Sequence, residues 1–346
     1  MSKIRTAVIG TGAIAKGVHL PALMKQEDVD VVAVCDIVEE AAQEAVDKFG
    51  VPSMYLDYRE LLKREDIDAV HVCTGNKMHS PISVDALKSG KHVIVEKPMA
   101  RNAAEAGLMA EAARATGKKL MVAQCMRFSE EAQCIQSFID AGELGDVYFG
   151  RVWALRRRGI PSWGVFIDKE EQGGGALIDI GVHALDMTLA FMGHPKPVTC
   201  SGQAFGKIGN SPGHVGQLGD WDWARCTVED YAAAFVRFDN GASLIIESSF
   251  AANLGDERMN GMVLGTKGGA ETNPFKIYSE GHGALLDITP VWLPEVQKYE
   301  AEIRAFYDSI HSDSEVPITP AQTLNVMKII DAIYRSSAER REVAID

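Results

Sequence analysis

The strongest constraint on the fold is a regular alternation of short apolar runs and longer helical segments between Lys3 and Cys125. Each apolar run has the length of a strand and is rich in Val, Ile and Ala, and the segments between the runs have helical spacing. This alternation is typical of a parallel sheet with right-handed crossovers. We therefore predict a doubly wound α/β domain, with strands in IRTAVIG, VDVVAVCD, DAVHVCT, KHVIVE and KLMVAQC.

The pattern of apolar runs changes after residue 143. Longer β-like runs such as EDYAAAFVRFDNGASLIIESSF follow, joined by turns such as Asp239-Asn240-Gly241, and they predict a large, mostly antiparallel open sheet. Two helices are expected at 296–311 and 320–337. A length of 346 residues also favours two domains. We assign the first domain to residues 1–124 and the second to residues 125–346.

Composition excludes several classes of partner. The chain has 48 acidic and 35 basic residues, which argues against nucleic acid and against an anionic membrane surface. Its six cysteines form no CxxC pair, as expected for reduced thiols, and the N-terminus runs straight into a strand without a signal peptide. The most apolar helical stretch, 176–192, is too short for a membrane span and contains three ionisable residues. We expect a cytoplasmic protein.

A glycine-rich turn, GTGAIA, follows the first expected strand. Gly10 and Gly12 occupy the first two glycine positions of a dinucleotide fingerprint, Ala13 and Ile14 continue the turn, and Ala15 stands where the third glycine often lies. Glycine allows the tight turn and a close approach of the backbone to a pyrophosphate, which binds amide groups at the helix N-terminus. Taken alone, the motif is also compatible with a turn that binds no ligand.

Asp36, at the end of the second strand, makes the nucleotide interpretation more specific. A carboxylate at this position accepts hydrogen bonds from a ribose 2′-hydroxyl and repels a 2′-phosphate. The next residues, Ile37 and Val38, provide no arginine for such a phosphate. The sequence therefore predicts NAD as the cofactor in preference to NADP.

Polar residues also follow the third and fourth strands. Thr74, Asn76 and His79 follow VHVC, and Glu96-Lys97-Pro98 follows HVIV. The carboxyl edge of an open parallel sheet is where ligands bind, so we assign these residues to the cofactor site. The alternative is ordinary turn chemistry with an exposed lysine.

The stretch GGGALIDIGVHALD places Asp179, His183 and Asp186 about one helical turn apart. A carboxylate beside an imidazole orients the ring and favours its charged form, the arrangement needed to take a proton from a hydroxyl group. The alternative is a satisfied core histidine, an acid stabilised by the helix dipole and a surface acid. We expect Asp186 to anchor the helix.

Together, GTGAIA, Asp36, the residues from Thr74 to His79, Glu96-Lys97-Pro98 and GGGALIDIGVHALD resemble the Gfo/Idh/MocA family of glucose-fructose oxidoreductases, inositol dehydrogenases and related enzymes. The resemblance spans nearly the whole chain. It implies an N-terminal Rossmann domain and a C-terminal α/β domain whose open sheet forms a homodimer or homotetramer face. It also implies a cis peptide before Pro98.

The resemblance further assigns individual roles. It implies that Lys97, Asp179 and His183 are catalytic and that Arg127 lies near the nicotinamide. Trp163 either walls the nicotinamide or sugar face or is a core tryptophan. No metal is expected.

From these residues we predict an NAD-dependent dehydrogenase that oxidises a secondary alcohol of a sugar, glycoside or cyclitol. One alternative is a glycosidase that retains NAD and uses transient oxidation and elimination. Another is a non-enzymatic sugar or nucleotide sensor, which would need no general base.

Overall fold

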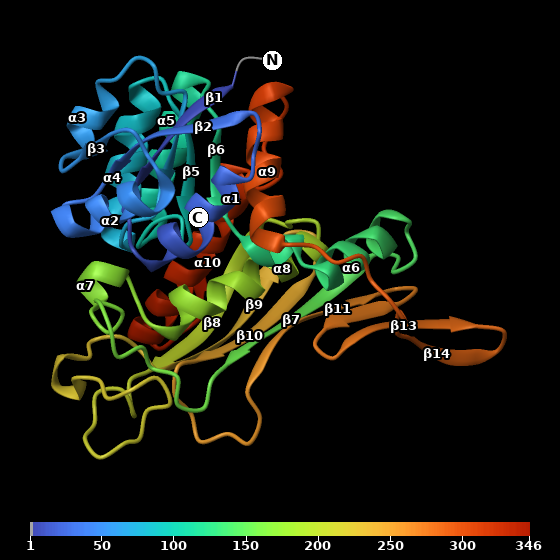
Figure 1. Cartoon of the computed structure of the whole chain (residues 1–346). Helices are drawn as coiled ribbons and strands as arrows, with labels where there is room; N and C mark the ends of the chain where they lie inside the picture. The colour runs from blue at the N-terminus through green and yellow to red at the C-terminus, as the bar shows by residue number, and fades with distance from the viewer. Residues whose placement is uncertain (1–2) are drawn as a thin grey trace. The chain divides into compact units, whose positions relative to one another are not determined.

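The computed structural model describes residues 3–346 and divides into two compact units. The first unit contains the chain up to Cys125 together with Gln297–Leu324. The second unit contains Met126–Val296 and Asn325–Asp346. Each unit has its own sheet, and Figure 1 traces the chain through both of them.

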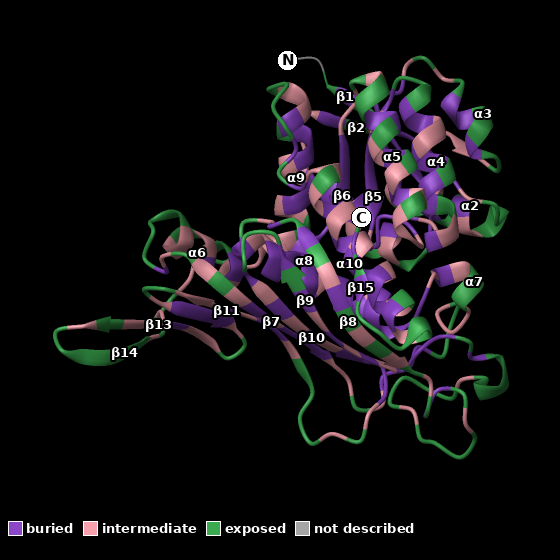
Figure 2. Ribbon diagram, turned by 180° about the vertical axis from the view of Figure 1, so that it is seen from behind, coloured by how far each residue is buried: buried purple, intermediate pink, exposed green. Residues whose placement is uncertain are grey.

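The first unit is built on a parallel sheet with strand order β3-β2-β1-β4-β5-β6. The apolar runs identified in the sequence form its central strands, which are buried on both faces (Figure 2). The order reverses between β1 and β4, so the strand ends on either side of this point open a crevice for a ligand. The strands are β1 Ile4–Ile9, β2 Val29–Cys35, β3 Met54–Tyr55, β4 Ala69–Val72, β5 His92–Glu96 and β6 Leu120–Ala123.

Helices cover both faces of this sheet, with α4 and α5 on one face and α1 and α9 on the other (Figure 1). Local signals set their limits: the Asn102 side chain accepts a hydrogen bond from Glu105 N at the start of α5, and Gly117 ends α5 in the left-handed conformation. The helices are η1 Ala15–His19, α1 Leu20–Met24, α2 Glu39–Phe49, α3 Tyr58–Leu62, α4 Asn76–Lys88, α5 Ala103–Thr116 and α9 Lys298–His311; η2 Cys125–Phe128 leads into the second unit.

The second unit contains a nine-stranded sheet with order β14-β13-β12-β11-β7-β10-β9-β8-β15. Every pairing in it is antiparallel except that of β7 with β10, which confirms the expected mostly antiparallel sheet. The predicted turn at 239–241 joins β9 to β10. The strands are β7 Val147–Leu155, β8 Pro197–Phe205, β9 Tyr231–Phe238, β10 Ser243–Ser249, β11 Arg258–Gly265, β12 Gly269–Thr272, β13 Phe275–Gly281, β14 Ala284–Ile288 and β15 Val343–Ala344.

Helix α8 packs on β7 and β11 and makes the core of this unit. The β13–β14 hairpin extends beyond that core, and its second strand, β14, is largely exposed (Figure 2). The helical segments are α6 Glu130–Asp140, α7 Lys169–Gln172, η3 Leu177–Gly181, α8 Val182–Phe191 and η4 Trp223–Arg225; α10 Pro320–Glu339 begins in the first unit and ends in the second.

One helix departs from the expected division at residue 124. Helix α9 belongs to the first unit, although residues 125–346 were expected to form a single domain. Its apolar face explains this, because Ile303, Phe306 and Tyr307 are fully buried and Tyr307 donates a hydrogen bond to Thr6 in β1. The sequence predicted a helix at 296–311, but not which sheet it would cover.

The segment Lys169–Phe191 is long and apolar enough to cross a membrane, judged by length and composition alone. However, 83% of its most apolar window is buried inside the protein. A core helix of the second unit therefore accounts for its apolar character. The six cysteines are all free.

Candidate active site

The glycine-rich turn follows β1 and has the geometry that its sequence predicts. Gly10 has φ of +89°, and a Cβ atom there would lie 2.6 Å from the carbonyl oxygen of Cys73, so only glycine fits. A Cβ on Gly12 would meet no atom within 4 Å. The backbone at Gly12 therefore faces open space, which is the room that a pyrophosphate needs.

Asp36 holds this turn in place. Its carboxylate accepts hydrogen bonds from the backbone N of Thr11 at 2.7 Å and the Thr11 hydroxyl at 3.1 Å, and its other oxygen accepts from Val38 N at 2.9 Å. Gly10, Gly12 and Asp36 line one cavity of about 590 Å³. The carboxylate thus lies where a ribose would meet the turn.

Arg59 also lines this cavity, and the sequence interpretation missed it. Arg59 lies in α3, far along the chain from the turn, so no local motif marks it. Its guanidinium group is 3.6 Å from the Asp57 carboxylate and lies over the Tyr58 ring. The pairing with Asp57 balances its charge within the cavity.

Thr74, after β4, is the fourth predicted residue in the cavity lining. Its hydroxyl oxygen is buried and has no hydrogen-bond partner within residues 3–346. A buried polar atom of this kind costs free energy unless a ligand or water satisfies it. Together with the open space at Gly12 and the Asp36 carboxylate, this hydroxyl fits a dinucleotide.

His79 was expected to contact the cofactor, but its side chain does not line the cavity. The ring is fully buried, with Nδ1 2.7 Å from the carbonyl oxygen of Pro98 and Nε2 3.0 Å from that of Thr74. Burial lowers the pKa of His79. The ring therefore joins the loops after β4 and β5, while Asn76 begins α4.

Glu96 also turns into the protein. Its carboxylate lies 2.9 Å from His19 Nε2 and accepts a hydrogen bond from the backbone N of Lys97 at 3.1 Å. The Lys97-Pro98 peptide is cis, as the resemblance implied. Lys97 itself is partly exposed at the carboxyl edge of the sheet.

In the second unit, the helix that carries Asp179 and His183 is almost completely buried. Between Gly174 and Leu189, these two residues alone are partly exposed, and all the others are buried. The turn that contains Asp179, η3, is a π-helix, in which hydrogen bonds close one residue later than in an α-helix. Short π segments inside α-helices occur frequently at functional sites.

A buried carboxylate sets the start of this helix. Glu229 accepts hydrogen bonds from the backbone N of Gly175 and of Leu177, at 2.8 and 2.9 Å, and from the Tyr334 hydroxyl at 2.9 Å. Burial raises the pKa of Glu229, although these hydrogen bonds oppose the shift. A Cβ on Gly174 would lie 2.0 Å from the Tyr334 hydroxyl, and one on Gly175 would lie 2.1 Å from Glu229 O. The glycine run is therefore required by close packing.

Asp186 and Arg127 form a buried ion pair. The guanidinium group contacts both carboxylate oxygens at 2.6 Å, with side-chain exposures of 10% for Arg127 and 0% for Asp186. The interpretation of Asp186 as a surface acid is wrong, and its expected anchoring of the helix agrees with this contact. The contact of Arg127 with nicotinamide stays a prediction.

Trp163 lies in the loop after β7 and is 54% exposed, with an edge-on contact to Phe166. It is therefore not a core tryptophan. Its role as a wall of the site stays a prediction.

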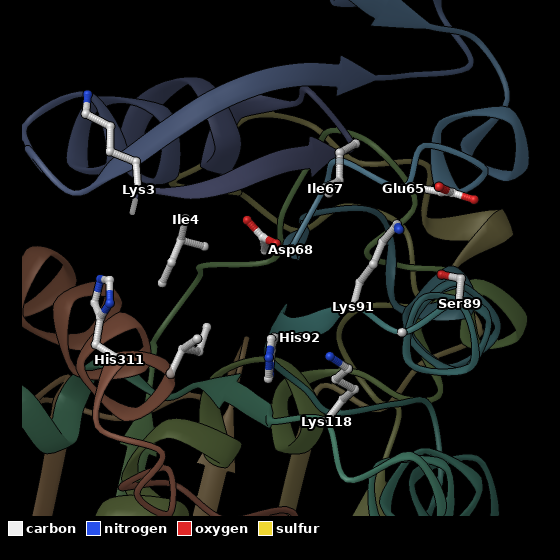
Figure 3. A pocket seen from close by; sticks show the side chains of 12 residues that line it. Lys3, Ile4, Glu65, Ile67, Asp68, Ser89, Lys91, His92, Lys118 and His311 are labelled. Atoms are coloured by element: carbon white, nitrogen blue, oxygen red, sulfur yellow. The ribbon is translucent and has the colours of Figure 1, made fainter. Parts of the chain in front are cut away.

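A second cavity, of about 670 Å³, lies at the opposite edge of the first sheet. Side chains from the strand beginnings line it, including Ile4, Asp68 and His92, with Lys91 and Lys118 beside them (Figure 3). None of the predicted site residues lines this cavity. Within residues 3–346, no group of three or more His, Cys, Asp or Glu side chains could hold a metal ion.

Comparison with known proteins divides the chain after residue 124 and, unlike the compact units, keeps α9 with the C-terminal part. Residues 4–124 match the model of an oxidoreductase family with an NAD-binding Rossmann fold, and residues 136–345 match the model of its C-terminal alpha/beta domain. D-glucoside 3-dehydrogenase of Escherichia coli K12 is 34% identical over 97% of this chain and 96% of that protein. Myo-inositol 2-dehydrogenase of Thermotoga maritima is 28% identical over 77% of this chain and 74% of that protein.

Solved structures share the fold. Levoglucosan dehydrogenase in complex with NADH and L-sorbose superposes with a TM-score of 0.87 and 22% sequence identity, covering 100% of both chains. An oxidoreductase domain protein from Kribbella flavida gives the same TM-score with 24% identity and the same coverage.

Proposed function

The chain belongs to the Gfo/Idh/MocA oxidoreductase family, and we propose that within this family it oxidises a secondary alcohol of a sugar, glycoside or cyclitol. It is an NAD-dependent oxidoreductase that acts on CH–OH groups, as the resemblance implied. The names of its relatives, which include a D-glucoside 3-dehydrogenase and a myo-inositol 2-dehydrogenase, support a polyhydroxylated ring as substrate. The observation that carries the proposal is that Asp179 and His183 alone are partly exposed along an otherwise buried helix, between Gly174 and Leu189.

The first unit has the residues to hold NAD. The backbone at Gly10 and Gly12 would receive the pyrophosphate, Asp36 would bind the adenosine ribose, and the Thr74 hydroxyl would gain the hydrogen-bond partner that it lacks. When bound, NAD supplies the acceptor for the hydride.

His183 is the proposed general base. It takes the proton from the substrate hydroxyl group as the C–H bond breaks, and Asp179 orients the imidazole and hydrogen-bonds a neighbouring hydroxyl. Lys97 donates a hydrogen bond to the reacting oxygen and stabilises the negative charge that develops there.

The experiment is a screen of polyols, pyranoses and glycosides for NADH formation at saturating NAD. We expect net NADH from a subset of these substrates. A glycosidase that retains NAD would instead release an aglycone without net NADH, and a sensor would produce neither.

We also propose a cytoplasmic homodimer or homotetramer. The free cysteines support a reducing compartment. Self-association is supported by the β13–β14 hairpin and the segment after it, where Leu285, Val291 and Trp292 are 89%, 105% and 76% exposed. Light scattering at several protein concentrations measures this, and a monomer at all concentrations would contradict it.

A further inference from the structure

A continuous chain of buried hydrogen bonds crosses the first unit and ends beside Lys97. It runs from the carbonyl oxygen of Ala69 through Thr6, Tyr307, His71 and His19 to Glu96, with successive contacts of 3.1, 2.9, 2.8, 2.8 and 2.9 Å. Thr6, His19, His71 and Tyr307 are each at most 1% exposed. Water therefore does not satisfy these groups, and each proton must be assigned within the chain.

Which group donates in each hydrogen bond can be worked out from the Ala69 end of the series. A carbonyl oxygen only accepts, so the Thr6 hydroxyl donates to it and accepts from the Tyr307 hydroxyl. The single proton of Tyr307 is then used, so Tyr307 accepts from His71 Nε2. In a neutral His71 the other nitrogen, Nδ1, is therefore an acceptor.

His19 must then donate on both sides. Its Nδ1 faces the acceptor nitrogen of His71, and its Nε2 faces the carboxylate of Glu96, which also only accepts when ionised. We propose that His19 is a buried imidazolium cation at neutral pH and above, and that its ion pair with Glu96 positions Lys97. The link to Lys97 is direct, because the second oxygen of Glu96 accepts the Lys97 backbone N–H.

The electrostatics of the surrounding groups agree with this assignment. Burial opposes the charged form of His19, but Cys73 and Glu96 raise the pKa of His19 well above its ordinary value. Burial, with a smaller contribution from the charge on His19, lowers the pKa of His71 well below its ordinary value. Burial also raises the pKa of the Cys73 thiol, which is therefore uncharged at neutral pH, so the charge that supports a cationic His19 there is that of Glu96, whose carboxylate contacts the ring at 2.9 Å.

The alternative is a neutral pair, in which the proton resides on Glu96 and His19 Nε2 accepts. The second hydrogen bond of Glu96, from the Lys97 N–H, favours the ionised carboxylate and disfavours this alternative.

The ion pair also connects two elements of the proposed site. His19 ends the π-helical segment η1, which follows the glycine-rich turn, and Glu96 ends β5 before Lys97. His19 is thus a positioning residue rather than a catalytic one. The effect of His19 on turnover depends on the role proposed for Lys97. The protonation state of His19 does not depend on that role.

The test is ¹⁵N NMR of the full-length protein labelled at histidine, with the His19 signals identified by their loss in His19→Gln. At pH 8.5, about two units above the pKa of a free imidazole, we expect both ring nitrogens of His19 to be protonated. Glu96→Gln should make His19 neutral at this pH, because the amide can donate to Nε2. A neutral His19 in the wild type would overturn the proposal.

A variant at the far end of the hydrogen-bond series tests whether the whole series determines the charge of His19. In Tyr307→Phe, His71 loses its acceptor, so its proton is expected on Nδ1, where it can donate to a neutral His19. A charged His19 would instead require the His71 proton to stay on Nε2, where it has no acceptor in this variant. The cost of that buried, unpaired donor should lower the pKa of His19 by about one unit. An unchanged His19 pKa in Tyr307→Phe would contradict the proton assignment.

Kinetics test the positioning of Lys97 separately. His19→Ala should lower kcat by about 10- to 100-fold, the range expected for a small misplacement, whereas Tyr307→Phe keeps the His19–Glu96 contact and should retain turnover within about 3-fold of wild type. Wild-type kcat in folded His19→Ala would overturn the positioning role. If no sugar is turned over at all, the proposed function fails and the NMR result still decides the protonation of His19.

Discussion

At the scale of single residues, we propose that Asp36 decides the choice between NAD and NADP. Asp36→Ala removes the carboxylate that is proposed to accept hydrogen bonds from the ribose. The same carboxylate accepts hydrogen bonds from the backbone N and the hydroxyl of Thr11, so these are lost as well. Loss of a charged hydrogen bond should weaken NAD binding by about 10- to 100-fold and narrow the advantage of NAD over NADP. Calorimetric Kd values for both dinucleotides check this, with Val38→Ala as a control in the same loop. A wild type that binds NADP more tightly would refute the assignment.

Residue types were more predictable than their contacts. The sequence identified Glu96, His79 and Asp186 because polar groups at strand ends or inside an apolar helix are conspicuous. The structure turns Glu96 toward His19, His79 toward two carbonyl oxygens and Asp186 toward Arg127. Such partners lie up to 77 residues apart in the sequence, so no local pattern specifies them.

At the scale of elements, the glycine run controls where the helix of Asp179 and His183 begins. Gly175→Ala would place a methyl group 2.1 Å from Glu229 O, where neither backbone can yield easily. We expect a loss of about 1–3 kcal/mol in the free energy of unfolding, with reduced turnover because the helix start shifts. Urea denaturation measures the stability.

The matched control is Gly107→Ala in α5, where an added Cβ meets no atom within 4 Å. Alanine is the better helix former, so this variant should be as stable as the wild type or more stable by up to about 1 kcal/mol. Equal stability of Gly175→Ala and Gly107→Ala would show that the close packing at Glu229 does not constrain the helix.

Helical spacing predicted that Asp179 and His183 share a face, but not the π turn between them. A π segment persists because of contacts with its surroundings rather than because of a local preference, and here Glu229 and Tyr334 provide those contacts from distant elements. The same limit explains α9, which was predicted as a helix while its place in the first unit was not.

At the scale of the whole molecule, the fold class followed from strand length and alternation, and the parallel and mostly antiparallel sheets confirm it. Each unit also contains a histidine that stays neutral in the folded state. Burial and the neighbouring lysines lower the pKa of His92 to about 4, and burial with the charge of Arg127 lowers that of His194 to about 3.

Both histidines predict a loss of stability in acid. The unfolded chain binds these protons near pH 6.5, whereas the folded chain does not until about pH 4 and 3. Between these values the unfolded state binds more protons, so stability falls as the pH drops from 6.5 toward 4. Melting temperatures across this range measure the effect. His194→Gln should flatten the slope, and an unchanged slope would contradict the shift at His194.

The central claim is that His183 and Asp179 carry out one proton transfer. The most direct measurement is single-turnover hydride transfer at saturating NAD, on variants shown to be folded, with a substrate found in the screen. We predict that His183→Ala lowers the rate by about two to four orders of magnitude with nearly unchanged NAD binding, and that the double variant with Asp179→Asn is little worse than the poorer single variant. Lys97→Met should also impair turnover, whereas Asp186→Asn should mainly lower stability, because it leaves the Arg127 charge buried without its partner carboxylate. A near-wild-type rate in His183→Ala would contradict the assignment of the base.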